Sequence, residues 1–501
     1  MAKKYLKLVV AWIAIVCLLN STAVYARENV SDSQTKNLEY LEAVMEMILE
    51  KYQGEITIQE LIDGAIRGMF NTMDPYTIYY SMDEAQDFLG QVNGSYEGIG
   101  VTMRRNGKYI EVIRVSESSP AEKAGLYPGD RITAVDGTSV VEATLDEANS
   151  LIRGSSGTKV VLEVVRGEDV RKIEVTRGEI LYNPVTYRIN GDIGYIKLEI
   201  FNSNSADEMR KALKEMDKKK IKKIVLDLRD NPGGDVSQAV AIARMFVPAG
   251  LITKLDFKSD ATPDVEYYSY LKKTKYDLVM LVNGMSASSS EIVAGAVQDT
   301  KAGILIGAKT FGKAKVQSII PLLAPEAYEK YKKQLGVEVV NAYDLIYTYN
   351  IIPLEEEIIG YSKITTGMYT TPNGRMIDLV GIEPDIEVED PELVNGVDVR
   401  SIEKLSKTVK YTMGSEGADV YYAENILKAL GYNIDDPDSK YDKKTFEAIK
   451  EFQKKKGGYS YGTMDFTTQQ WLNEELDKLL LEYDKQYAKA IEQLRQAEVL
   501  Q

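Results

Sequence analysis

The sequence contains no histidine and only one cysteine, Cys17. A serine hydroxyl is a weak nucleophile that needs a neighbouring base, and without an imidazole that base must be a lysine amine or a carboxylate. Every Ser-His mechanism is therefore excluded. Because Cys17 lies in an N-terminal segment that we expect to be removed, the mature chain also lacks a thiol nucleophile and thiolate ligands for a metal. We predict no metal site.

Basic residues are few relative to acidic ones. The chain has 61 lysines and arginines against 76 aspartates and glutamates, which gives a formal net charge of -15. An acidic chain is a poor nucleic-acid binder, so we expect no nucleic-acid partner. The sequence contains neither a dinucleotide-binding fingerprint nor a complete phosphate-cradling G-x-x-x-x-G-K-[ST] motif, and we predict no cofactor.

The most informative stretch is residues 283–317, which begins N-G-M-S-A-S-S-S-E-I and ends T-F-G-K-A-K-V-Q. The apolar run from Leu278 to Val282 predicts a buried strand, and the residues from Ser288 onward predict a helix. Ser288 would then lie at a strand-to-helix junction, where free backbone N–H groups can bind an oxyanion. A second predicted strand, Gly303 to Ala308, leads to Lys313.

These motifs resemble those of the carboxy-terminal processing peptidases, a family of secreted Ser-Lys proteases. The resemblance implies that Ser288 is the nucleophile, that Lys313 is the general base and that Gln317 orients the lysine. Lys315 competes for the role of base, because in an extended segment it points to the same face as Lys313. The position of the lysine after F-G in the family favours Lys313.

The oxyanion hole is expected at the motif D-L-R-D-N-P-G-G, residues 227–234. The resemblance implies that its donors are Gly233, Gly234 and the amide of Ser289. Paired glycines allow the backbone to approach a substrate carbonyl, which agrees with this role. A serine-rich helix start alone is usually an ordinary cap, but three separated motifs in this order favour a catalytic site.

Residues 94–178 form the second informative block. Alternating apolar residues predict half-buried strands, and Thr144 to Glu147 spells a capping box that predicts a helix. The block resembles a PDZ domain. The resemblance implies that the G-I-G-V turn offers its N–H groups to the carboxylate of a peptide C-terminus, which binds as an added strand. The residues of this turn are Gly98, Ile99, Gly100 and Val101.

The N-terminus predicts export. Three lysines precede an apolar stretch from Leu8 to Leu19, and this pattern indicates a signal peptide that is cleaved after Ala26. An apolar stretch of 12 residues is short for a membrane span, which needs about 20. An uncleaved anchor is the alternative. We therefore expect an extracytoplasmic protein.

The C-terminal part of the chain contains two further features. Residues 418–472 resemble a three-helix peptidoglycan-binding domain, for which a purely structural appendage is the alternative. Beyond it, apolar residues recur at four-and-three spacing and predict a partner helix, and hence a homodimer. These residues are Leu476, Leu480, Tyr483, Tyr487, Ile491 and Leu494.

The predicted fold class is multidomain α/β, with N-terminal helices, a PDZ domain, an α/β tail-specific protease core of the ClpP/crotonase-like type and a C-terminal three-helix domain. The expected boundaries are a signal peptide at 1–26, a helical region at 27–93, a PDZ domain at 94–178, a serine protease core at 181–390 with an insertion at about 322–362, a peptidoglycan-binding-like domain at 418–472 and a C-terminal helix at 473–501.

The sequence thus predicts an exported serine endopeptidase that cleaves proteins near C-termini bound by its PDZ domain. The expected partners are proteins or peptides with free C-termini, peptidoglycan, a regulatory protein and a second copy of the chain. Because the insertion follows Gln317 closely, we hypothesise that it narrows access for the substrate. The alternative is a catalytically silent scaffold that binds peptides and the cell wall.

Overall fold

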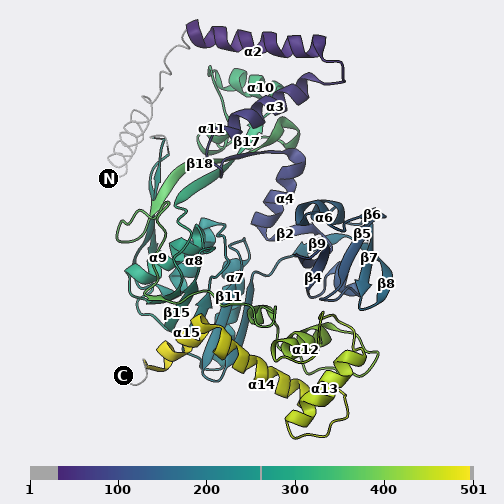
Figure 1. Cartoon of the computed structure of the whole chain (residues 1–501). Coiled ribbons are helices and arrows are strands. Elements are labelled where there is room, and N and C mark those ends of the chain that lie inside the picture. The colour runs from purple at the N-terminus through teal and green to yellow at the C-terminus, as the bar shows by residue number, and fades with distance from the viewer. Residues whose placement is uncertain (1–31, 260–261, 497–501) are drawn as a thin grey trace, which may run out of the picture. The chain divides into compact units, whose positions relative to one another are not determined.

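The computed structural model describes residues 32–259 and 262–496, and the chain divides into two compact units, Met1–Tyr79 and Tyr80–Gln501 (Figure 1). The predicted signal peptide, residues 1–26, lies outside the described residues. The first unit contains α2 (Asp32–Lys51) and α3 (Ile58–Asn71), and β1 (Ile78–Ser81) begins at its end. A capping box begins α3, because Thr57 and Glu60 each accept from the other's backbone N–H.

The second unit begins with α4 (Met82–Asn93) and a short antiparallel pair, β2 (Ser95–Gly98) with β9 (Gly178–Leu181). Between these strands lies an antiparallel sheet in the order β3-β4-β5-β7-β8, with β6 paired to β5. The bounds of its elements are β3 (Val101–Asn106), β4 (Tyr109–Val115), α5 (Pro120–Lys123), β5 (Arg131–Val135), β6 (Thr138–Ser139), α6 (Leu145–Ile152), β7 (Lys159–Arg166) and β8 (Asp169–Thr176). Side chains alternate along β7, so that Val160, Leu162 and Val164 are fully buried in the core of this domain.

A mostly parallel sheet follows in the order β10-β11-β12-β15-β16-β19, in which only the β10-β11 pair is antiparallel. Its strands are β10 (Val185–Asn190), β11 (Ile193–Leu198), β12 (Lys223–Asp227), β15 (Asp277–Val282), β16 (Gly303–Gly307) and β19 (Ile386–Glu387). The crossover helices α7 (Ser205–Lys218), α8 (Val236–Phe246) and α9 (Ser289–Asp299) bury their apolar faces in one core with the sheet. The strands predicted around 278–282 and 303–308 and the helix predicted from Ser288 are confirmed.

A second, antiparallel sheet contains β13 (Gly250–Phe257), β14 (Val265–Ser269), β17 (Lys315–Leu323) and β18 (Ile358–Thr370). The segment expected as an insertion joins β17 to β18 and is folded. It contains α10 (Pro325–Leu335), α11 (Ala342–Tyr347) and the 3-10 helix η1 (Glu355–Glu357). Ala327, Tyr331, Val340 and Leu345 give the insertion a small core of its own.

The C-terminal region consists of η2 (Val399–Ser401), α12 (Ala418–Ala429), α13 (Lys443–Lys455), α14 (Phe466–Tyr483) and α15 (Lys485–Gln496). The sheet face opposite α7–α9 shares a core with these helices, and α15 (yellow in Figure 1) lies against β15 and its neighbours. No helix among residues 32–259 and 262–496 is long and apolar enough to span a membrane.

The prediction that the tail is a single partner helix is wrong. The helix is interrupted at Asp484, where α14 ends and α15 begins. The apolar side chains that were expected to face a partner are buried within the chain itself, except that of Tyr483. Leu476, Leu480, Tyr487, Ile491 and Leu494 belong to the core that the C-terminal helices share with the parallel sheet. Helical periodicity identifies an apolar face but not what covers it, and here the chain's own sheet covers it.

Candidate active site

The predicted nucleophile Ser288 lies in the sharp turn between β15 and α9. Its φ of 55° and ψ of -114° are unusual for a non-glycine residue, and such a backbone persists only where its surroundings hold it. The turn is held by neighbouring side chains, because Ser286 Oγ donates to the carbonyl of Leu228 and Ser290 Oγ donates to that of Asn231. The motif Asp227–Gly234 therefore supports the turn directly.

Glu291 joins the nucleophile turn to the lysine turn. One oxygen of its buried carboxylate accepts from the backbone N–H of Ser288 at 2.8 Å and from that of Lys313 at 2.9 Å. The other accepts from Thr310 Oγ1 at 2.6 Å and from the N–H of Gly312 at 2.7 Å. Burial raises the pKa of Glu291, and these hydrogen bonds oppose that shift. Glu291 belongs to the S-A-S-S-S-E motif, but nothing in the local sequence assigns it this bridging role.

Tyr369 on β18 makes a second connection between the same two turns. Its buried hydroxyl lies 2.9 Å from the carbonyl oxygen of Ser288 and 2.9 Å from that of Lys313, so the two acceptors share one proton. Burial raises the pKa of Tyr369 far above its ordinary value, and the phenol therefore stays a donor. The sequence carried no signal for this residue, because a tyrosine in a strand is usually only a packing residue.

The glycine turn lies directly against the nucleophile. A Cβ at Gly233 would be 2.8 Å from Ser288 Cβ and 2.9 Å from the amide nitrogen of Ser289, and one at Gly234 would be 2.1 Å from the carbonyl oxygen of Phe201. Both glycines also have positive φ, 100° and 139°. Any side chain would therefore displace this turn.

The three predicted oxyanion donors differ in their hydrogen bonding. The N–H of Gly233 already donates to Asn231 Oδ1 at 2.9 Å. The amides of Gly234 and Ser289 donate to no acceptor within residues 32–259 and 262–496. Ser289 Oγ donates to the carbonyl of Gly234 at 2.8 Å, which fixes the two residues relative to each other. Gly234 and Ser289 are thus the pair with free N–H groups.

Most of the predicted catalytic residues line one cavity of about 520 Å³. The cavity contains the predicted residues Ser288, Lys313, Gln317, Gly233 and Gly234. Lys315 lines the same cavity, so location does not separate it from Lys313. The backbone contacts differ, because Lys313 donates its N–H to Glu291 and accepts at its carbonyl from the hydroxyl of Tyr369.

Gln317, the residue predicted to orient the lysine, follows on β17. Its Nε2 donates to the carbonyl of Lys315 at 3.2 Å and to Thr365 Oγ1 at 3.3 Å. The side chain is therefore anchored to β18 within the cavity wall.

The four residues predicted to bind a peptide terminus lie away from this cavity. Gly98 ends β2, Ile99 is buried in the core of its domain, and Gly100 has a φ of 85° before Val101 begins β3. The carbonyls of Ile99 and Gly100 accept backbone hydrogen bonds that hold the turn. β3 is an edge strand of its sheet and contacts α6, which leaves an edge available for an added strand.

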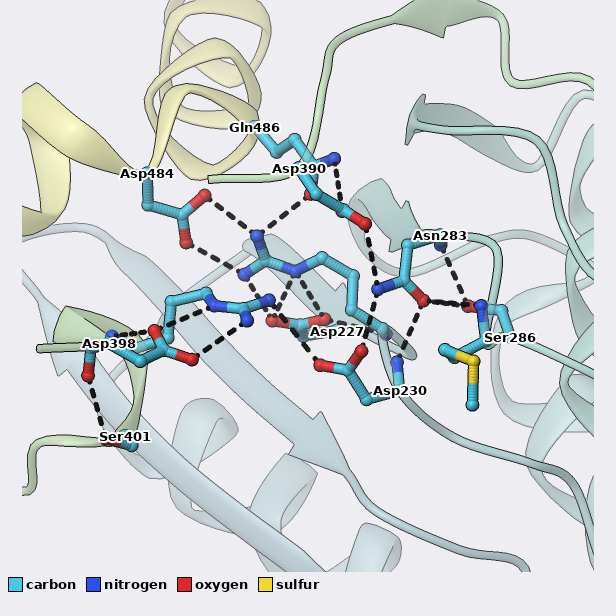
Figure 2. A network of polar contacts seen from close by, with 12 residues as sticks. Asp227, Asp230, Asn283, Ser286, Asp390, Asp398, Ser401, Asp484 and Gln486 are labelled. Atoms are coloured by element: carbon cyan, nitrogen blue, oxygen red, sulfur yellow. Dashed lines mark hydrogen bonds and ion pairs between the residues drawn. The ribbon is translucent and has the colours of Figure 1, made fainter. Parts of the chain in front are cut away.

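A buried polar network behind the catalytic turns reaches the C-terminal helices (Figure 2). Arg229 binds Asp227 through Nε and Nη2, and it binds Asp484, at the break between α14 and α15, through Nη1 and Nη2. Asp230 and Asn283 exchange two hydrogen bonds, one of which links the backbone of the glycine motif to the residue that opens the nucleophile turn. The network therefore connects the start of α15 to the glycine motif and to the nucleophile turn.

Gln486 extends this network. Its Oε1 accepts from Arg229 Nη1 at 3.0 Å, and its Nε2 donates to Asp390 Oδ1 at 2.9 Å. Figure 2 shows Asp484 and Gln486 pointing from the start of α15 toward Asp227 and Asp390.

Four family models match the chain. Peptidase family S41 matches residues 192–388, a PDZ domain matches residues 111–166, the N-terminal domain of the activating protease CtpB matches residues 8–85, and a peptidoglycan-binding domain matches residues 416–472. The carboxy-terminal processing protease CtpA of Bacillus subtilis is 31% identical over 97% of this chain and 96% of its own length. A "Probable CtpA-like serine protease" of Staphylococcus haemolyticus is 30% identical over 92% of this chain and 85% of its own length.

Among solved structures, the photosystem II D1 C-terminal processing protease is 26% identical over 72% of this chain and 94% of its own, with a TM-score of 0.40. The family matches and the CtpA relatives confirm the predicted fold class and the predicted enzyme class. The chain therefore belongs to peptidase family S41, as a serine-type protease of the carboxy-terminal processing kind with a PDZ domain and a C-terminal peptidoglycan-binding-type domain.

Proposed function

We propose that the protein is an exported serine endopeptidase that uses Ser288 and Lys313 to cleave proteins near C-termini held by its PDZ domain. The observation that carries this proposal is the common cavity, in which the strained turn of Ser288 and the turn of Lys313 are held together by Glu291. A serine and a lysine at such a site form the nucleophile and base of a histidine-free mechanism.

In this mechanism Ser288 Oγ attacks the scissile carbonyl while the neutral amine of Lys313 takes its proton. The base has to be the neutral form of Lys313, and apolar side chains such as Phe201 and Val316 line the same cavity. The free amides of Gly234 and Ser289 are positioned to receive the oxyanion. The protonated lysine then donates to the leaving amine, and water releases the acyl group from the serine by the reverse steps.

The PDZ domain is proposed to bind the substrate, and the two ends of the chain to set the location of the protein. The edge strand β3, which begins at Val101, offers backbone groups to an extended peptide, and a PDZ domain commonly binds a free chain terminus in this way. The CtpA relatives, the predicted signal peptide and the peptidoglycan-binding-type domain all support a position outside the cytoplasm. We further propose that the C-terminal domain contacts peptidoglycan.

The proposal is tested with the mature protein, residues 27–501, and an unfolded substrate that ends in small apolar residues. Fragments are followed by mass spectrometry beside a Ser288→Ala variant. Cleavage by the parent alone is expected. If the parent binds the substrate terminus but neither protein cleaves it, the chain acts as a scaffold and the proposal fails.

The identity of the base is tested by two matched lysine substitutions. Lys313→Ala should lower turnover at least about a thousand-fold, because the serine loses the group that accepts its proton. Lys315→Ala should retain turnover within about ten-fold of the parent, because its amine takes no part in proton transfer. The reverse result would assign the base to Lys315.

A further inference from the structure

The active-site cavity contains a lysine, Lys363, that the proposed mechanism does not use. In the register of β17 and β18, Ile319 lies opposite Lys363 and Gln317 lies opposite Thr365. Alternate residues of a strand share one face, so Lys363 shares the face of Gln317 and is its diagonal neighbour. The presence of Gln317, Ile319 and Lys363 in the cavity wall agrees with this register. Lys363 is thus a cation within reach of a peptide bound beside Ser288.

Among the described side chains, none provides a counter-charge for Lys363. Its Nζ lies 5.5 Å from the ring centroid of Phe88, and burial alone lowers its pKa. No hydrogen bond or ion pair joins it to a carboxylate in the described parts of the chain. A half-buried ammonium group without an anion is unfavourable until a ligand supplies one.

Basic residues outnumber acidic ones in the described wall of the cavity. Among the described residues, its wall contains three lysines, Lys313, Lys315 and Lys363, and one acidic residue, Asp235. The carboxylate of Asp235 already caps α8 by accepting from the backbone N–H of Gln238. The described part of the wall therefore carries more basic than acidic side chains, although the chain as a whole is acidic.

We propose that Lys363 binds a carboxylate of the substrate, so that the protease prefers peptides with an acidic group next to the cleaved bond. This inference rests on the proposed function of the cavity. An ammonium group has three donors and no acceptor, which suits a carboxylate. The carboxylate has two sources, the side chain of an aspartate or glutamate and the free terminus of the substrate chain.

The test uses peptides that differ at one position only, with glutamate or its neutral isostere glutamine placed in turn on either side of the cleaved bond. The parent should cleave the preferred glutamate peptide with a kcat/KM about 10- to 100-fold above that of the glutamine peptide, the range of a charge-assisted hydrogen bond. Lys363→Met should remove this ratio while still cleaving the glutamine peptide. Lys363→Glu should invert it, and Lys363→Arg should keep most of it.

Two controls make the test specific. Lys333→Met removes an exposed lysine of α10 that lies outside the cavity and should leave the ratio unchanged. Peptides with a free terminal carboxylate are compared with their C-terminal amides. If the ratio follows the terminus rather than the side chain, Lys363 binds the substrate's own end.

The outcome is separable from that of the proposed function. Binding of the same peptides to Ser288→Ala should show the same preference for glutamate without any turnover. A parent that cleaves both peptides equally, or a Lys363→Met variant that keeps the ratio, overturns the role of Lys363 and leaves the protease intact. A parent that cleaves neither peptide refutes the proposed function, and the binding ratio still decides whether Lys363 binds a carboxylate.

Discussion

Two buried arginines, Arg229 in the protease core and Arg166 in the PDZ domain, attach the C-terminal region in the same way but to different extents. Arg229 pairs with Asp227 at the end of β12 and with Asp484 between α14 and α15, and the side chains of all three are only 2% exposed. Burial alone would raise the pKa of Asp227, but Arg229 lowers it to about 2. Ion pairs of this kind depend on every partner, because removing one leaves a charge buried without compensation.

Arg166 makes the corresponding contacts in the PDZ domain. It binds Asp130 of its own domain through Nε and Nη2, and its Nη1 donates to Glu416 of the C-terminal region at 2.9 Å. The side chain of Glu416 is 23% exposed and also binds Arg171. If the contact between Arg166 and Glu416 is broken, water and Arg171 can therefore still stabilise the Glu416 carboxylate.

The difference between the two arginines indicates what each attachment does. Arg229 lies four residues before Gly233 in the motif that supports the nucleophile turn. Because Arg229 also binds Asp484 and Gln486, the start of α15 is linked to the active site through this arginine. Arg166 lies at the end of β7, and neither it nor Glu416 lines the catalytic cavity. We infer that the first attachment matters for turnover and the second for the placement of the PDZ domain.

The largest effect is expected from Asp484→Ala. The substitution leaves Arg229 buried with one carboxylate fewer, and the free energy of unfolding should fall by about 3–5 kcal/mol. Turnover should fall at least about ten-fold in the fraction that remains folded, because the turn of Gly233 loses its support. Chemical denaturation and peptide cleavage measure the two effects. An Asp484→Ala enzyme with full turnover would contradict the role given to α15.

A smaller effect is expected from Glu416→Ala, the matched change at the other arginine. Arg166 keeps Asp130, so the free energy of unfolding should fall by about 1–3 kcal/mol. Cleavage of short peptides should remain within about two-fold of the parent, because the contact lies outside the cavity. A loss of turnover as large as that of Asp484→Ala would show that both attachments act on the active site.

The catalytic turns illustrate which features the sequence alone could predict. Ser288 and Lys313 belong to short local motifs, and the strand or helix beside each has a clear apolar pattern. Glu291 accepts from Thr310, 19 residues away, and Tyr369 donates to Ser288, 81 residues away, and no local pattern predicts such contacts. Their role depends on tertiary contacts, which the local sequence pattern does not reveal.

The C-terminal helices show the same limit for the fold. The spacing of Leu480 and Tyr487 correctly predicts one apolar face, since both are 2% exposed. The same spacing serves a second chain or the chain's own sheet equally well. The polar residue Asp484 between them indicates that this face packs against the chain's own protease core, because Asp484 pairs there with Arg229. That pairing is visible only in the tertiary structure.

The pH dependence of stability should also separate the two regions. The folded pKa of Asp227, about 2, lies below its ordinary value, so its contribution to stability is present above about pH 4 and is lost as the pH falls toward 2. Burial raises the pKa of Asp438, which packs against Gly129 and Gly167 of the PDZ domain, to about 6. Its contribution is present below about pH 4 and is lost as the pH rises through 6.

Asp438→Asn tests this difference. The variant avoids the cost of a buried charge at neutral pH, so its free energy of unfolding should exceed that of the parent by about 1–2 kcal/mol at pH 7 and by little at pH 4. Denaturation series at both pH values measure the change. An equal effect at pH 4 and pH 7 would exclude titration of Asp438 as its cause.

The smallest effect is expected from Arg171→Gln, which removes the second arginine beside Glu416. Arg171 is 32% exposed, and water can solvate the carboxylate that it leaves, so the free energy of unfolding should fall by at most about 1 kcal/mol. The loss should shrink at high salt, since exposed charges are screened, whereas the loss in Asp484→Ala should not. A salt-independent loss in Arg171→Gln would mean that Glu416 is sealed from water like Asp484. The two arginine sites would then be equivalent attachments of the C-terminal region, and the PDZ domain would be held as rigidly as the glycine turn.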